Sequence, residues 1–115
     1  MEIKSKVLGV ILGLMFVSSI AFAEESLNLT SQEWFDKGLN AYGQQKYGEA
    51  INCYTQAIKI NPKYVIAYTK RGVLYCFKGN YDKAWDDVHK VESLGGQVPE
   101  FLLKALPKAP SGGTL

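Results

Sequence analysis

Lys46-Tyr47-Gly48-Glu49-Ala50 returns 34 positions later as Asn80-Tyr81-Asp82-Lys83-Ala84. Upstream of it, Trp34-Phe35-Asp36-Lys37-Gly38 is matched at the same spacing by Tyr68-Thr69-Lys70-Arg71-Gly72. Self-similarity at a fixed period of this length indicates stacked structural units, each of which buries its apolar face on the next. The sequence therefore predicts a repeat protein.

Glycines at matching places predict that helices pack closely within each unit. Gly38 lies among apolar residues at helical spacing, and Gly72 repeats it in the second unit. A glycine inside a helix costs about 1 kcal/mol relative to alanine, so its recurrence in register indicates a packing role. We expect each glycine to let two antiparallel helices approach one another.

The ends of the helices are marked by capping signals. Thr30 followed by Glu33 forms a capping box that predicts a helix start. Asn61-Pro62 predicts the end of the second helix, since the residue before proline is disfavoured in the helical region. Gly95-Gly96 predicts the end of the fourth helix, because glycine accepts a left-handed conformation.

Both units resemble the tetratricopeptide repeat, a family of antiparallel helix pairs. In the first helix of the first unit, Trp34 is the bulky residue and Gly38 the glycine that this family uses. Tyr47 is the aromatic residue at the turn. Ala50 and Ala57 are the small residues of the second helix, and Pro62 is the closing proline. The second unit supplies Tyr68, Gly72, Tyr81 and Ala84 but departs from the pattern near its end, with Val91 and Gly96. The resemblance implies an all-α fold, a short tetratricopeptide-type solenoid of two antiparallel helix pairs over residues 31–64 and 65–98.

A capping helix is predicted over residues 99–106. Phe101, Leu102 and Leu106 lie largely on one side of this segment, so we expect it to cover the open apolar end of the second repeat. Residues 24–30 form a lead-in to the first helix. The tail over residues 107–115 is rich in proline, glycine and serine and is predicted to be disordered.

Residues 1–23 have the pattern of a secretory signal peptide. Lys4 and Lys6 precede an uncharged apolar run over residues 7–17, and Ala21-Phe22-Ala23 provides small residues at the cleavage positions. This pattern predicts an exported protein, periplasmic or secreted. An uncleaved membrane anchor is the alternative.

The composition excludes some classes of partner. The formal net charge of the chain is +2, and removing residues 1–23 would take away two lysines and one glutamate and leave it near +1. No basic stripe with interleaved aromatic residues indicates nucleic-acid binding. Two repeats and one cap bury only a modest core, so association with a partner or with a second copy of the chain would stabilise the fold.

The two cysteines leave more than one possibility open. The repeat geometry places Cys76 toward the concave side of the solenoid and Cys53 outward on the convex side. We therefore expect free thiols that act as small apolar residues. An intramolecular bridge and an intermolecular link are the alternatives, because an exported chain meets an oxidising compartment.

Little in the sequence indicates catalysis. His89, the one histidine of the chain, is expected on the outer face of its helix. Asp86-Asp87 reads as a solvated charged face, with Lys83 and Lys90 one turn away. No phosphate-binding loop, nucleophile motif or metal-ligand spacing occurs. We expect no enzymatic activity and no cofactor.

The resemblance places partner binding on the concave face, which helix A lines in this family. It assigns the partner-binding positions to Phe35, Leu39, Tyr42, Ile66, Lys70, Val73 and Phe77. Some family members clamp the C-terminal carboxylate of a chaperone there with lysine and asparagine. Phe35, Leu39 and Lys70 occupy the corresponding positions here, so that clamp is largely absent. We expect Phe35 and Phe77 to anchor a partner and to lie outside the contact between helices.

Two functions are consistent with these features. The first is an exported, non-catalytic protein-protein interaction module that binds a peptide or helix of an envelope partner in its concave groove. The second is a self-assembling or membrane-anchored structural subunit, a possible homo-oligomer. In that case another copy, or the chain's own residues 24–29, would cover the groove.

Overall fold

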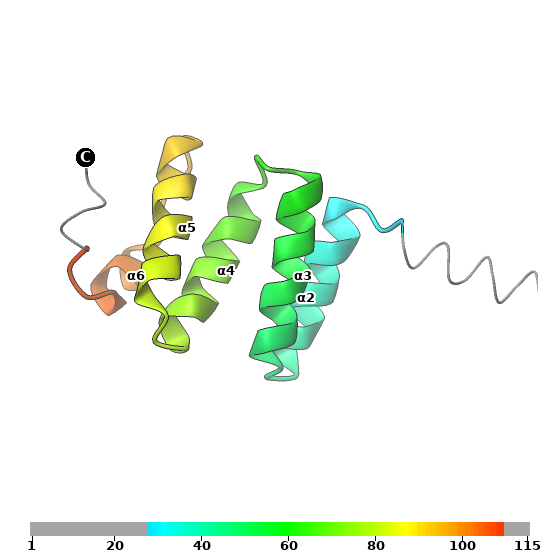
Figure 1. The fold of residues 1–115 in the computed structure, drawn as a ribbon, viewed down its shortest axis with the longest axis horizontal. Coiled ribbons are helices and arrows are strands. Elements are labelled where there is room, and N and C mark those ends of the chain that lie inside the picture. Colours follow the sequence, from blue (N-terminus) through cyan, green and yellow to red (C-terminus); the bar gives the residue numbers. More distant parts are fainter. Residues whose placement is uncertain (1–27, 110–115) are drawn as a thin grey trace, which may run out of the picture.

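A computed structural model describes residues 28–109, and all regular secondary structure in this part of the chain is helical. The helices are α2 (Ser31–Gly43), α3 (Tyr47–Ile60), α4 (Val65–Phe77), α5 (Tyr81–Ser93) and α6 (Glu100–Ala105) (Figure 1). The predicted signal peptide and most of the predicted lead-in and tail lie outside the described residues. The expectation of an all-α fold is confirmed.

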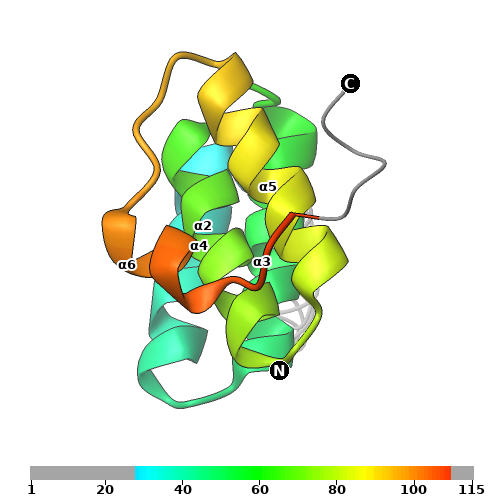
Figure 2. The same ribbon diagram turned by 90° about the vertical axis from the view of Figure 1, so that its left-hand side faces the viewer.

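The helices are arranged as two hairpins followed by a short cap. α2 packs along α3, α4 packs along α5, and the two hairpins meet where α3 contacts α4. Seen along the stack from its C-terminal end, α2 and α4 lie on one side and α3 and α5 on the other (Figure 2). This two-layer stack is the predicted tetratricopeptide-like solenoid, and α6 contacts its end at α4.

Both recurring glycines lie at close contacts between the helices of a hairpin. A Cβ atom on Gly38 would stand 2.5 Å from Cε1 of Tyr54, inside the space that the aromatic ring occupies. A Cβ atom on Gly72 would come within 3.2 Å of the Asp87 Cβ. The repetition of glycine therefore has the packing cause that the sequence predicts.

The helix ends show which capping signals operate. Thr30 Oγ1 accepts a hydrogen bond from the Glu33 amide at 3.2 Å, and Glu33 Oε2 accepts one from the Thr30 amide at 2.7 Å, which confirms the capping box. Gly79 and Gly95 follow α4 and α5 with φ angles of 76° and 77°. Gln45 takes the equivalent turn position after α2 with φ 61°, a conformation that costs a residue with a side chain about 1 kcal/mol or more.

The cap covers the second repeat with fewer side chains than predicted. Leu102 and Leu106 are buried against Ala84 and Val88 of α5. Phe101, in contrast, is 58% exposed, so its expected place on the covered side is wrong. A helix of six residues presents one narrow face to α4 and α5, and Leu102 and Leu106 occupy that face.

Candidate functional site

The candidate binding surface is built mainly from one stripe along α4. Ile66, Lys70, Val73 and Phe77 follow one another at spacings of three and four residues, which places them on the same side of the helix. Ile66 is 48% exposed and Phe77 is 61% exposed, while Lys70 is exposed and Val73 is half-buried. The stripe is therefore an accessible apolar surface with one cationic side chain.

α2 adds two further side chains to the same layer of the solenoid. Leu39 and Tyr42 are exposed and lie one helical turn apart. The Tyr42 ring is 5.8 Å from the ring of Tyr47 at the start of α3, an aromatic pair that holds it over the α2–α3 turn. We call these two residues, together with the α4 stripe, the A-helix face, since Figure 2 places α2 and α4 on the same side of the stack.

Phe35, the seventh predicted site residue, lies in the core. It is 5% exposed, and its ring centroid is 5.4 Å from that of Tyr54 and 5.2 Å from that of Tyr64. The expectation that Phe35 lies outside the contact between helices is wrong. Tyr64 stands in the connection just before α4, so Phe35 joins the two hairpins and is not free to anchor a partner.

A polar edge borders the A-helix face beside α2. Tyr64 Oη donates a hydrogen bond to Gln32 Oε1 at 2.7 Å, and Gln32 Nε2 donates to Asp36 Oδ1 at 2.9 Å. Burial and the neighbouring Asp36 charge raise the pKa of the Tyr64 phenol. The chain of contacts fixes the side-chain amide of Gln32 between the two hairpins.

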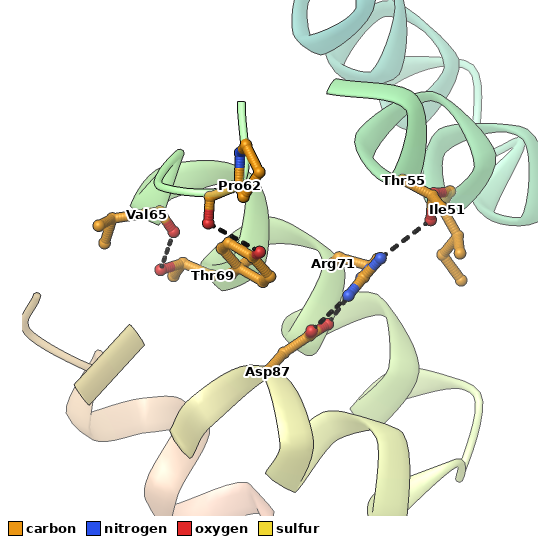
Figure 3. A network of polar contacts seen from close by, with 8 residues as sticks. Ile51, Thr55, Pro62, Val65, Thr69, Arg71 and Asp87 are labelled. Atoms are coloured by element: carbon orange, nitrogen blue, oxygen red, sulfur yellow. Dashed lines mark hydrogen bonds and ion pairs between the residues drawn. The ribbon is translucent and has the colours of Figure 1, made fainter. Parts of the chain in front are cut away.

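A buried ion pair supports the A-helix face from behind. Arg71 of α4 donates to both carboxylate oxygens of Asp87 in α5, at 2.9 and 2.7 Å, and its Nη1 donates to Thr55 Oγ1 of α3 at 3.1 Å (Figure 3). Asp87 is 3% exposed, so its assignment to a solvated charged face is wrong. Three helices are joined through one guanidinium group.

Burial affects the two members of this ion pair differently. It raises the pKa of the Asp87 carboxyl, and the hydrogen bonds and charge of Arg71 offset only part of that effect. Burial alone would lower the pKa of Arg71, but contact with Asp87 outweighs it and raises the pKa further above neutrality. The rings of Tyr68 and Tyr75, each with its centroid 5.7 Å from Arg71 Cζ, flank the guanidinium. The pair is a structural support and offers no free acid or base.

Both cysteines are free thiols in this structure, and both are buried. The expected outward position of Cys53 is wrong, because its side chain is only 6% exposed. Cys76 is not on the concave surface either, since it is buried in the core cluster with Ala84 and Leu102. Burial raises the pKa of each thiol, and at Cys53 the Lys37 charge lowers the pKa and the Glu49 charge raises it, both by less than burial does. Neither thiol has the lowered pKa of a reactive cysteine.

Three further features of residues 28–109 bear on catalysis and on membrane insertion. His89 is half-buried, and its ring stacks on Trp85 with centroids 5.6 Å apart. In this range, no three His, Cys, Asp or Glu side chains gather as metal ligands would. None of the described helices combines the length and the apolar composition needed to cross a bilayer.

Comparison with known proteins agrees with the fold. Residues 38–79 match a family model described as TPR repeat. The chain is 39% identical over 75 residues to Hsp70-Hsp90 organizing protein 1 of Glycine max, an alignment that covers 57% of this chain. It is also 35% identical over 52 residues, 45% of this chain, to small glutamine-rich tetratricopeptide repeat-containing protein beta of Homo sapiens. These matches support a tetratricopeptide-repeat protein.

The alignments cover only a small part of each relative. They span 13% of the soybean protein and 17% of the human protein. At the level of the repeats, the matches support a protein-protein interaction module.

Proposed function

We propose that this chain is an exported, non-catalytic interaction module that binds a peptide or helix of an envelope protein on its A-helix face. In the tetratricopeptide family, this face lines the concave groove. The observation that carries the proposal is the apolar stripe of α4, on which Ile66 and Phe77 stay largely exposed although other apolar side chains of the same helix are buried.

The character of this surface indicates the chemistry of the partner. Tyr42, Ile66 and Phe77 present aromatic and branched aliphatic groups, which gain free energy when a partner covers them. Lys70 is the cation of the α4 stripe, and Asp36 stands at the polar edge of α2. A partner segment with apolar anchors at helical or extended spacing would fit this face better than a terminal carboxylate.

Capture of the partner by purified protein from the native envelope tests this proposal. Interface energy concentrates in a few large side chains, and truncation of such an anchor costs about 2 kcal/mol or more. The Ile66→Ala, Phe77→Ala variant should therefore lose most of the captured protein. Ile60→Ala, Phe101→Ala is the matched control, since both of its residues are as exposed but lie outside the face.

Self-assembly is the second candidate, and the cap supplies an observation in its favour. Phe101 and Leu103 of α6 are exposed at the end of the solenoid, where a further repeat or a second copy could cover them. Light scattering over a concentration series distinguishes the two functions. A monomer favours the interaction module, and a stable dimer that Phe101→Ser abolishes favours the structural subunit.

Export rests on the sequence pattern of residues 1–23. The proposal expects protein from the native host to begin at Glu24 when its mass is measured. An intact Met1 chain in the membrane fraction would instead support the anchored subunit.

A further inference from the structure

A surface hollow lies away from the A-helix face and shares no residue with it. It has a volume of about 440 Å³ and is formed by the first half of α3 and the corner between α4 and α5. Its lining residues are Gly48, Ile51, Asn52, Tyr75, Lys78, Asn80 and Lys83. The hollow thus combines two cations, two carboxamides, a phenol ring and one aliphatic side chain.

The two lysine side chains both reach this hollow. Lys78 Nζ lies 3.9 Å from the position that a Cβ atom on Gly48 would take, so it reaches from the end of α4 to the first turn of α3. Lys83 Nζ stands 5.5 Å from the centroid of the Tyr75 ring, a cation–π contact. The ammonium groups are therefore positioned on the wall of the hollow.

Neither lysine forms an ion pair with a carboxylate in the described part of the chain. Within residues 28–109, the ion pairs are those of Arg71 with Asp87 and of Lys104 with Glu100. The neighbouring carboxylates Glu49 and Asp82 are exposed, and neither pairs with Lys78 or Lys83. Glu49 and Asp82 partly cancel the positive potential of Lys78 and Lys83 at a distance. An anion from outside the chain is therefore attracted mainly when it contacts the two ammonium groups directly.

The carboxamides of the hollow are also available. Asn80 precedes α5 but its side chain makes no capping hydrogen bond, and it stands beside Lys78 and Lys83. Amide groups of this kind bind the backbone of a peptide, whereas Ile51 and Tyr75 offer apolar surface to the methylene groups of its side chains. A compact inorganic anion would leave the apolar surface of Ile51 and Tyr75 uncovered.

We infer that this hollow binds an acidic peptide segment, with two neighbouring carboxylates on Lys78 and Lys83 and the peptide backbone on Asn52 and Asn80. The site is independent of the proposed function, because none of its residues belongs to the A-helix face. The protein would then hold two different segments, one apolar and one acidic.

Titration of the purified protein with acetylated tetraglutamate amide, followed by amide chemical shifts, tests the inference. We expect shifts to concentrate at Gly48, Asn52 and Asn80 and binding to weaken as salt is added. Lys78→Gln, Lys83→Gln should weaken binding roughly tenfold, since an exposed charge pair contributes a few-fold for each lysine. Lys59→Gln, Lys90→Gln removes two exposed lysines outside the hollow and should bind as the parent does.

A second variant keeps the test independent of any loss of folding. Gly48→Asp places a carboxylate beside Lys78 in the first turn of α3, where an acidic residue favours the helix. It should weaken tetraglutamate binding several-fold while the melting temperature stays level or rises. Equal binding by both double lysine variants, shifts scattered over the surface, or a stronger response to inorganic phosphate than to tetraglutamate would each overturn the inference.

Discussion

Arg71 and Asp87 face each other across the second hairpin and share two hydrogen bonds, at 2.9 and 2.7 Å. The same guanidinium reaches Thr55 of the first hairpin, so this pair joins the repeats as well as the helices of one repeat. Because the A-helix face runs along α4, the ion pair fixes the helix that carries most of that face.

Asp87→Asn should destabilise the protein by about 3 kcal/mol, because it leaves the half-buried Arg71 charge without its counter-ion. Urea denaturation followed by circular dichroism measures the loss. Asp86→Asn, which alters the exposed neighbouring carboxylate, is the control and should change stability by less than about 0.5 kcal/mol. Similar midpoints for the two variants would show that the pair contributes no net stability.

Gly38→Leu should cost about 1–3 kcal/mol by overpacking the contact between α2 and the Tyr54 ring. Gly43→Ala serves as the counterpart, since no atom outside its own helix and chain neighbours lies within 4 Å of a Cβ placed there. The alanine should gain up to about 1 kcal/mol of helix propensity. If Gly38→Leu had the same melting temperature as the parent, the close contact between α2 and α3 at this position would be ruled out.

Tyr54 predicts a loss of stability at alkaline pH. Its hydroxyl is buried without a hydrogen-bond partner in the described part of the chain, and burial, with the neighbouring Tyr42 and Cys53, raises its pKa from 10.0 to about 12. Below pH 10 the Tyr54 phenol is protonated in both the folded and the unfolded chain, so its titration takes nothing from the free energy of unfolding. As the pH rises from 10 through 12, the unfolded chain releases its proton first and stability falls by up to about 2.7 kcal/mol.

Comparison of Tyr54→Phe with the parent isolates this effect. The phenylalanine removes the unpaired hydroxyl, so at pH 7 we expect it to match or exceed the parent by about 1 kcal/mol. Its free energy of unfolding should fall less steeply between pH 10 and 12, and any remaining fall comes from other groups, such as Tyr64 and Tyr68, whose pKa values burial also raises. Parallel curves for the two proteins would assign the alkaline loss to other groups.

The sequence predicts the framework of the fold because its signals are local and repeated. Gly38 and Gly72 occupy the same position of the repeat, so the same close contact between helices is predicted for both hairpins. The Thr30 and Glu33 capping box depends on residues three apart and forms without regard to tertiary structure.

The predictions for Phe35 and Asp87 are wrong because the burial of each side chain depends on residues that are distant in the sequence. Phe35 is drawn into the core by Tyr64, which belongs to a connection whose path the repeat pattern does not define. In the sequence, Asp87 cannot be distinguished from its exposed neighbour Asp86. Only the folded chain brings Arg71, 16 positions away, into contact with it. Helical spacing alone could have suggested that Asp87 lies on the side of Val91, which is buried.

Site-specific photo-crosslinking in the native host tests the binding account most directly. A photo-reactive phenylalanine analogue at position 77 stands on the A-helix face, and the same analogue at position 101 stands on the cap with similar exposure. We predict a discrete crosslinked species from position 77, absent at position 101 and lost when Ile66→Ala is added. Crosslinks of equal yield from both positions, or from position 101 alone, would contradict the claim that the A-helix face is the binding site.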